Sequence, residues 1–273
     1  AKKLSSGVEY LLKKNKVVIF DGEASFKTSK SIVITSKNNV TKEIFGKNIC
    51  IASGGRPREI SGVPNSSNVW FYKEALQVDK IPNKLLIVGS GAIGIEFASF
   101  FAQMGSEVSI LESKPTILPN EDLEVSNFVE KQFLNRGIKI YKNHLLLSLK
   151  EKGSLFEAEL KSADKTLSLE FEKAILAIGI VGNIENLNLE SININCSNGS
   201  IVVDEYCKTN VDNIYAIGDV ASPPWLAHKA SHEGISVAEQ IAGMNVHPIK
   251  KDRIPACPYC DPEVASIGLT EKE

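Results

Sequence analysis

A glycine-rich loop is the stretch of the sequence with the clearest chemistry. Gly89, Gly91 and Gly94 match the pattern G-x-G-x-x-G, with the apolar run KLLIV before them and a helical apolar pattern after them. The first glycine permits a tight turn, the second lets the backbone approach a pyrophosphate, and the third allows a helix to pack closely on a strand. The start of that helix offers free N–H groups and a positive dipole end to an anion. The loop therefore predicts a dinucleotide site.

An acidic residue, Glu112, ends the apolar run that follows this helix. An acid in this place can accept hydrogen bonds from both ribose hydroxyls of NAD, and its charge repels the 2′-phosphate of NADP. We therefore expect NAD rather than NADP, although the positive charge of Lys114 close by works against this preference. The alternative is a Rossmann unit that binds nothing, in which Glu112 is only a solvated strand end. The exchange Glu112→Arg tests the preference.

Two other groups of residues have the types and spacing of chemical sites. Cys257 and Cys260 form a C-x-x-C pair, the spacing of redox and zinc sites. Pro258 lies between them in an extended segment, where positions three apart face opposite sides, so we expect a structural role. His228 and His232 lie four apart on a predicted helix, but the sequence places no third ligand. We therefore expect no metal site.

The elements that must position the glycine loop follow from hydrophobic periodicity. Strands and helices alternate from Lys84 to about Gly182, which implies a parallel sheet with right-handed crossovers. One helix follows the loop, and a second is expected over about 122–136. Further elements are expected as a helix over 4–14, a strand at 16–20, a helix over about 228–242, and two strands after Ile254, in ACPYC and VASIGL.

Composition excludes several classes of protein. A chain of 273 residues with 43% hydrophobic and 23% charged residues is typical of a globular protein with more than one domain. The net charge of -2 argues against a nucleic-acid partner, and no apolar run approaches the roughly 20 residues of a membrane span. Five scattered cysteines favour a reducing cytoplasm over a disulfide framework. Both ends lie close to predicted elements, so we expect a piece of a longer protein.

Four ordered stretches resemble a known family. IASGGRP, IVGSGAIGIEFASFFAQMGSEVSILE, AILAIG and TNVDNIYAIGDVASPPWLAHKASHEG occur in this order in the two-dinucleotide flavoprotein disulfide reductases. The runs LAHKASHEG and IPACPYCDPEVASIGLTE are most similar to the members that act on dihydrolipoamide. The resemblance covers almost the whole chain, and several ordered motifs are far more specific than one glycine loop.

The resemblance implies an α/β architecture with two Rossmann-like dinucleotide-binding domains. An FAD domain would be interrupted by an inserted NAD domain, and the start of an α+β interface domain would follow. Residues 1–80 would be the later part of the first FAD-domain segment with its linker, and residues 81–182 the NAD-binding domain. Residues 183–253 would be the returning FAD-domain segment, and residues 254–273 the start of the interface, or dimerisation, domain.

The resemblance also implies roles for individual residues. Glu96 would pair with a lysine on the flavin side, and Ile93 would lie near the stacked nicotinamide. After Gly179 the family continues with arginine, a spacer and proline, and Ile180 and Gly182 here lack those side chains. Together the loop and the resemblance give NAD contacts from Gly89, Ser90, Gly91, Ala92, Ile93, Gly94, Glu112, His144 and Gly179, and FAD contacts from Ala24, Gly54, Glu96, Asp219, Ala227 and His228.

The implied reaction is a relay in which protein-bound dihydrolipoamide reduces a disulfide, the dithiol reduces FAD, and hydride passes to NAD. A lipoylated carrier domain of a 2-oxo-acid dehydrogenase complex would be the partner, and the enzyme would be a cytoplasmic homodimer without nucleic acid or membrane. The sequence contains no cysteines with the family's spacing C-x-x-x-x-C, no first flavin glycine loop and no His–Glu acid–base pair. We therefore expect no catalytic residue here and only background turnover. Alternatives are another flavin disulfide reductase with a different thiol substrate, or a non-catalytic dinucleotide-binding module.

Overall fold

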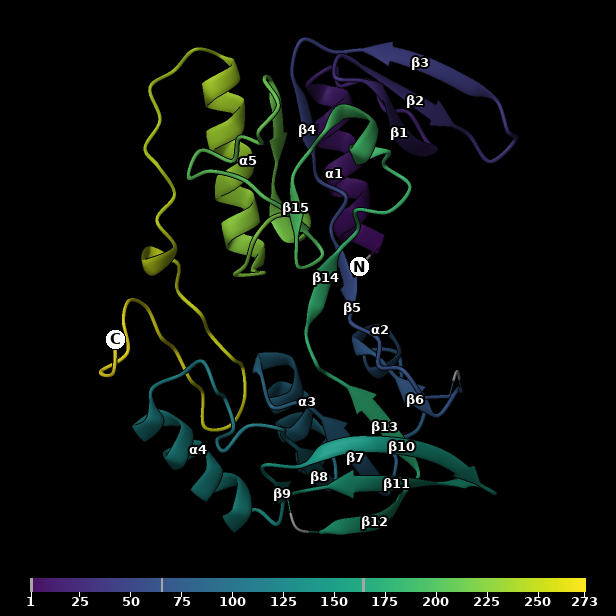
Figure 1. Cartoon of the computed structure of the whole chain (residues 1–273), viewed down its shortest axis with the longest axis vertical. Coiled ribbons are helices and arrows are strands. Elements are labelled where there is room, and N and C mark those ends of the chain that lie inside the picture. The colour runs from purple at the N-terminus through teal and green to yellow at the C-terminus, as the bar shows by residue number, and fades with distance from the viewer. Residues whose placement is uncertain (1, 65, 164) are drawn as a thin grey trace.

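The chain folds into two lobes, which lie at the bottom and the top of Figure 1. The computed structural model describes residues 2–64, 66–163 and 165–273. The predicted domain ranges contain Ala1, Asn65 and Asp164, which lie outside the described residues. The division into these domains stays a prediction. Among the described residues, every helix is too short or too polar to cross a membrane.

A five-stranded parallel sheet forms the centre of the lower lobe. Its strand order is β6-β13-β7-β8-β9, and every neighbouring pair is parallel, which confirms the sheet expected from the alternating pattern. The glycine loop leaves this sheet at the end of β7. The strands are β6 (Val69–Trp70), β7 (Lys84–Val88), β8 (Glu107–Leu111), β9 (Lys139–Tyr141) and β13 (Lys173–Leu176).

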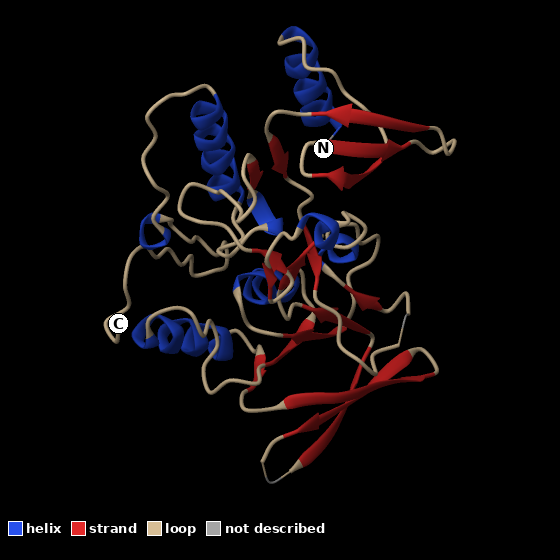
Figure 2. Ribbon diagram, turned by 45° about the horizontal axis from the view of Figure 1, so that its top comes forward, coloured by secondary structure: helices blue, strands red, loops and turns tan. Residues whose placement is uncertain are grey.

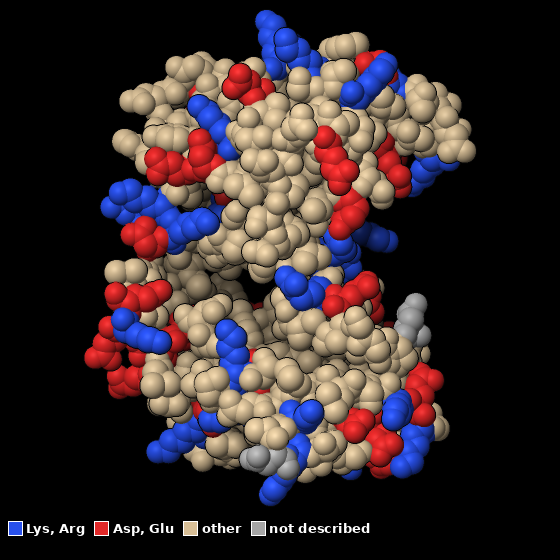
Figure 3. Space-filling view, viewed as in Figure 1, with Lys and Arg blue, Asp and Glu red and all other residues tan. Residues whose placement is uncertain are grey.

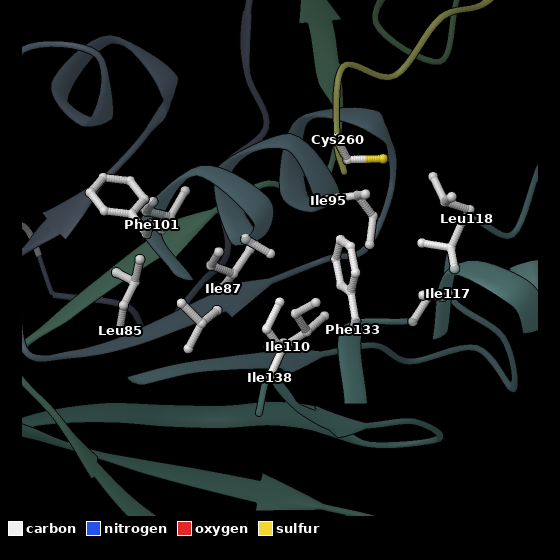
Figure 4. Packing of buried hydrophobic residues seen from close by; sticks show 14 of the residues in the cluster. Leu85, Ile87, Ile95, Phe101, Ile110, Ile117, Leu118, Phe133, Ile138 and Cys260 are labelled. Carbon is white, nitrogen blue, oxygen red and sulfur yellow. The ribbon is translucent and has the colours of Figure 1, made fainter. Parts of the chain in front are cut away.

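Both faces of this sheet are covered, which explains why β7 is a continuous apolar run rather than an alternating one. On one face, Leu85 and Ile87 pack with Phe101 and Phe133 from two helices (Figure 4). On the other face, Leu86 packs against an antiparallel three-stranded sheet. The covering elements are the helices α3 (Ala92–Gln103) and α4 (Leu123–Asn135) and the strands β10 (Leu145–Lys152), β11 (Leu155–Lys161) and β12 (Thr166–Phe171).

The helix expected over 122–136 is confirmed as α4, and its limits have local causes. Asp122 is the N-cap, and its side chain accepts a hydrogen bond from the backbone N–H of Glu124 at 3.0 Å. The chain leaves the helix after Arg136 through Gly137, whose φ of 82° is in the left-handed region that glycine tolerates. Glu271 also donates its backbone N–H to Asp122, so the C-terminal segment lies against this end of α4.

The upper lobe combines an antiparallel sheet, a parallel strand pair and helices, one of which lies beside the antiparallel sheet (Figure 2). Its core contains Ile49 and Ile51 from one strand of the pair, Ile214 from the other, and Ile201 and Val220. The antiparallel sheet is β1 (Glu23–Thr28), β2 (Ser31–Thr35) and β3 (Thr41–Phe45); the parallel pair is β4 (Ile49–Ile51) and β17 (Ile214–Ala216); the helix is α5 (Ala227–Ile241).

Two short antiparallel strands join the lobes. β5 (Gly55–Pro57) enters the lower lobe and β14 (Ile180–Gly182) returns from it, and the two are hydrogen-bonded neighbours. Arg56 ties them further, because its guanidinium donates to the carbonyl oxygen of Gly182 at 2.9 Å and to both carboxylate oxygens of Glu185 at 2.8 and 2.6 Å. The two crossings therefore act as one connection.

Two sequence-based expectations about strands are wrong. Residues 17–20 form no strand, and their apolar side chains are exposed because no described strand pairs with them. After Ile254 the two expected strands reduce to one isolated bridge between Ala256 and Ser266. The helix expected over residues 4–14 is confirmed as α1 (Lys2–Lys14). The remaining short elements are α2 (Tyr72–Ala75), β15 (Cys196–Ser197), β16 (Ser200–Ile201) and the 3₁₀ turns η1 (Leu189–Ile192), η2 (Gly218–Val220) and η3 (Lys251–Arg253).

Candidate dinucleotide-binding site

The glycine loop lies at the edge of the sheet where the parallel strands end. Gly89 follows β7 and donates its backbone N–H to Leu111 at the end of β8, at 2.8 Å. Glu112 directly follows β8, and its carbonyl oxygen accepts from the backbone N–H of His144, beyond β9, at 3.1 Å. Gly179 follows β13 on the other side of β7. Ligands of open α/β sheets bind at this edge, and the structure brings these predicted NAD residues together there.

Glycine is present at the three positions of the loop for different reasons. A Cβ on Gly89 would lie 2.4 Å from the carbonyl oxygen of Ala177, and the φ of Gly89 is 99°. A Cβ on Gly94 would lie 2.0 Å from the carbonyl oxygen of Gly89. The protein itself therefore requires glycine at these two positions. A Cβ on Gly91 would meet nothing within 4 Å, so the open space there fits the close approach of a pyrophosphate.

The beginning of α3 supplies donors to that open space. Gly91 is the N-cap of this 12-residue helix, and no side chain caps the helix there. The first N–H groups of a helix have no partner within it, and without a capping side chain they remain available to an anion. Ala92 and Ile93, the first two residues of α3, are the positions predicted to contact NAD. The loop therefore fits a diphosphate.

Glu112 is buried, with 6% of its surface exposed, and four donors hold its carboxylate. One oxygen, Oε2, accepts from the backbone N–H of Ser90 at 2.9 Å and from the Ser90 hydroxyl at 2.6 Å. The other, Oε1, accepts from the backbone N–H of Lys114 at 2.8 Å and from the Ser113 hydroxyl at 3.2 Å. The acid is thus turned toward the glycine loop, on the side where a ribose attached to the diphosphate would lie.

A second group of predicted residues meets in a cavity of about 710 Å³ between the lobes, where Figure 3 shows the surface hollowed. Ile93 and Glu96 line it from α3, and Asp219 and Ile180 line it from the upper lobe. Glu96 accepts a hydrogen bond from the backbone N–H of Tyr259 at 2.9 Å. A predicted NAD residue and two predicted FAD residues therefore share one apolar cavity, as expected for a site at a domain interface.

A buried ion pair on α5 holds the turn that carries Asp219. Gly218, with a φ of 70°, donates its backbone N–H to Glu233 at 2.8 Å. The other oxygen of Glu233 pairs with Lys229 at 2.7 Å, and each side chain is only 4% exposed. Both residues come from α5, which begins at Ala227 without a side-chain cap. The pair therefore sets the position of Asp219 relative to this helix.

The other predicted FAD residues lie in three different places. Gly54 has a φ of 74°, and its carbonyl oxygen accepts from the backbone N–H of Asn183 at 2.9 Å. It directly precedes Gly55, the first residue of β5, which packs beside Asp219. The imidazole Nε2 of His228 lies 2.8 Å from the carbonyl oxygen of Pro255, on the exposed side of α5. Ala24 is in β1, paired with Ile34, and it does not line the cavity. Ala24 and Asp219 are therefore not brought together.

Sequence reasoning missed the packing role of Ile180 and Gly182, which stand where the family pattern has arginine and proline. A Cβ on Gly55 would lie 2.7 Å from the Ile180 side chain and 3.1 Å from that of Asp219, so glycine is needed for their close packing. A Cβ on Gly182 would lie 2.9 Å from the carbonyl oxygen of Gly199. Gly55 and Gly182 were visible in the sequence as glycines, but the residues that they pack against, such as Ile180 for Gly55 and Gly199 for Gly182, were not.

Cys257 and Cys260 differ in exposure, as their spacing in an extended segment predicts. Cys257 is exposed, while Cys260 is 4% exposed and packs in the core of the lower lobe (Figure 4). Burial raises the pKa of the Cys260 thiol to about 11. Among the described residues, no cluster of three or more His, Cys, Asp or Glu side chains could hold a metal ion.

We expect iodoacetamide at pH 8 to alkylate Cys257 and to leave Cys260 unmodified, because the reactive thiolate is roughly one part in a thousand of a thiol whose pKa is about 11. Mass spectrometry of peptides from the native and the urea-unfolded chain measures this directly. Unfolding should make the two cysteines equally reactive. Equal alkylation in the native chain would contradict the buried position of Cys260.

Comparison with known proteins agrees with this fold. A model of the pyridine nucleotide-disulphide oxidoreductase family matches residues 1–234. The chain belongs to the pyridine nucleotide-disulphide oxidoreductase family.

Among its relatives are dihydrolipoyl dehydrogenases of Rhizobium etli, 44% identical over 98% of this chain, and of Zymomonas mobilis, 46% identical over 100% of it. The chain spans 60% and 59% of the length of these two relatives. The crystal structure of LpdA from Mycobacterium tuberculosis matches 99% of this chain and 60% of its own, with a TM-score of 0.92 and 25% identity.

Proposed function

We propose that the glycine loop binds NAD(H), with the diphosphate at the start of α3 and the adenosine ribose at Glu112. The observation that carries this proposal is the loop geometry, in which glycine is required by the protein at Gly89 and Gly94 but not at Gly91. The unfilled space above Gly91 and the uncapped helix start support an anionic ligand there. The buried carboxylate of Glu112 supports a ribose with free hydroxyls rather than a 2′-phosphate.

For the whole protein we propose the activity of a dihydrolipoyl dehydrogenase, which oxidises protein-bound dihydrolipoamide and passes the electrons to NAD⁺. Identities of 44% and 46% over 98–100% of this chain support it. FAD, when bound, would carry electrons between a dithiol and the nicotinamide. Ile93 would shape the nicotinamide side of the shared cavity, Glu96 would belong to its flavin side, and Asp219 would accept hydrogen bonds from flavin hydroxyls.

The partner and assembly follow from the same proposal. A lipoylated carrier domain of a 2-oxo-acid dehydrogenase complex would deliver the dithiol, and the whole protein would be a homodimer in a reducing cytoplasm. Five cysteines without a disulfide support the compartment. The division into an FAD domain and an inserted NAD domain is part of the proposal, and the two crossings β5 and β14 support it.

Fluorescence titration of this chain with NADH tests the coenzyme site directly. Turnover of dihydrolipoamide with NAD⁺ by the whole polypeptide that carries this sequence tests the activity separately. A chain that binds NADH within a whole protein that does not oxidise dihydrolipoamide would favour another thiol substrate. A chain that binds neither NADH nor NADPH would contradict the site itself.

Glu112→Arg should lower the affinity for NADH by about tenfold or more, because the charge-assisted hydrogen bonding of the carboxylate to ribose is lost. The affinity for NADPH should rise relative to NADH, since a 2′-phosphate would face a positive charge. Parallel fluorescence titrations with the two coenzymes measure the ratio. Glu112→Gln is the matched control, because it keeps the shape and removes the charge. An unchanged ratio in Glu112→Arg would contradict the assignment of Glu112.

A further inference from the structure

Ser90 makes an unusual double contact with the buried acid. Its backbone N–H and its hydroxyl both donate to the same oxygen, Oε2 of Glu112, at 2.9 and 2.6 Å. Ser90 is fully buried, so water cannot replace either donor. A hydroxyl-to-carboxylate distance of 2.6 Å is in the range of strong, charge-assisted hydrogen bonds. One residue therefore holds one oxygen of the acid with two donors.

The other oxygen of Glu112 is held less firmly. Oε1 accepts from the backbone N–H of Lys114 at 2.8 Å and from the hydroxyl of Ser113 at 3.2 Å. Ser113 is exposed, and its hydroxyl can rotate away to water. A carboxylate has about four acceptor positions, and the four donors fill them. An incoming ribose hydroxyl must therefore replace one donor, and the long bond from the exposed Ser113 hydroxyl is the weakest of the four.

We propose that Ser90 is a positioning residue that sets the coenzyme preference of this site by fixing the plane of the Glu112 carboxylate. The inference rests on the proposed NAD site. With Oε2 held by Ser90, the rotation of the carboxylate about its last torsion, which is otherwise broad, is restricted. Oε1 then faces the edge where Ser113 is exposed, and a ribose hydroxyl takes the place of the Ser113 hydroxyl. The Ser90 hydroxyl, which donates to Oε2, acts through Glu112 rather than on the coenzyme.

The physical consequence is that Ser90 affects NADH and NADPH differently. A fixed carboxylate accepts from a ribose hydroxyl without losing further rotational freedom, so NADH gains from the preorganisation. NADPH gains nothing from it, because its 2′-phosphate meets the negative charge of Glu112 in either case. A change in general stability would weaken the binding of both coenzymes alike.

The test uses the whole chain and titrations with NADH and NADPH, followed by coenzyme fluorescence. We expect Ser90→Ala to weaken NADH binding about three- to tenfold, because a carboxylate that can rotate must be ordered when ribose binds, and to change NADPH binding less than twofold. Ser113→Ala should leave NADH binding unchanged or slightly tighter. Ser106→Ala is the matched control: its buried hydroxyl also makes a 2.6 Å bond, to Pro82, at the opposite end of the sheet.

A double-mutant cycle separates positioning from a structural effect. In a Glu112→Ala background, the additional change Ser90→Ala should have no effect on NADH affinity, because the carboxylate that Ser90 holds is gone. Thermal unfolding of each variant verifies that it is folded. NADH affinity within twofold of the wild-type chain in Ser90→Ala, or an equal loss for both coenzymes, would overturn the role of Ser90 alone. No NADH binding by the wild-type chain would instead overturn the coenzyme site.

Discussion

Replacing Lys229 by methionine is expected to lower the free energy of unfolding by about 3–5 kcal/mol. Lys229 and Glu233 form an ion pair at 2.7 Å, with 4% of each side chain exposed. Methionine fills the space of the lysine stem but leaves the Glu233 carboxylate buried without its counter-charge. A buried charge that loses its partner costs far more than an exposed pair contributes. The damage should extend to the Asp219 turn, because Glu233 also accepts from the backbone N–H of Gly218.

Urea unfolding followed by circular dichroism measures this loss. The double variant Lys229→Met with Glu233→Gln should regain much of the stability, because a glutamine oxygen still accepts from Gly218 and no charge remains buried. Lys152→Met, at the exposed pair with Glu170, is the surface control and should change stability little. Losses that simply add in the double variant would mean that the two side chains do not act as a pair.

Gly94→Ala is expected to destabilise the chain by about 3 kcal/mol or more, whereas Gly91→Ala should change its stability by less than about 1 kcal/mol. The added Cβ at Gly94 would lie 2.0 Å from the carbonyl oxygen of Gly89, so the helix and the loop would have to separate. At Gly91 the added Cβ meets nothing within 4 Å, and the φ of -69° suits any residue. The two glycines thus serve the fold and the ligand respectively.

For NADH binding, the informative change is Gly91→Ala. Gly91→Ala should remain folded but lose NADH affinity by about tenfold or more, because its methyl group occupies the space of the diphosphate. The same unfolding experiment and an NADH titration on each variant give both numbers. A Gly91→Ala chain that binds NADH as tightly as the wild-type chain would place the diphosphate elsewhere.

Local sequence signals predicted the elements around the site well. The helix α4 was predictable because Asp122 caps it and Gly137 ends it, and these two residues lie one position before the helix and two positions after it. The glycine loop, the acid that follows it and the parallel direction of the strands also follow from short-range patterns. These features need no knowledge of distant contacts.

Features that depend on distant partners could not be predicted in the same way. Residues 17–20 have the composition of a strand, but a strand requires a partner, and the sequence does not say whether one is present. The i,i+4 spacing of Lys229 and Glu233 is visible in the sequence, while their burial beneath Gly218 is not. The same holds for Glu112. The sequence predicted that its carboxylate binds ribose, but not that Ser90 donates to this carboxylate within the protein.

The paired crossings β5 and β14 have a consequence for how such a protein could arise. Because Pro57 and Ile180 are register partners, the lower lobe leaves and rejoins the upper lobe at nearly the same point. A tight turn placed between these two residues would close the path of the upper lobe after deletion of everything between them. The segment between them is therefore an insertion that interrupts the path of the upper lobe at one point, while Cys260 and Val264 from the C-terminal segment complete the core of the lower lobe.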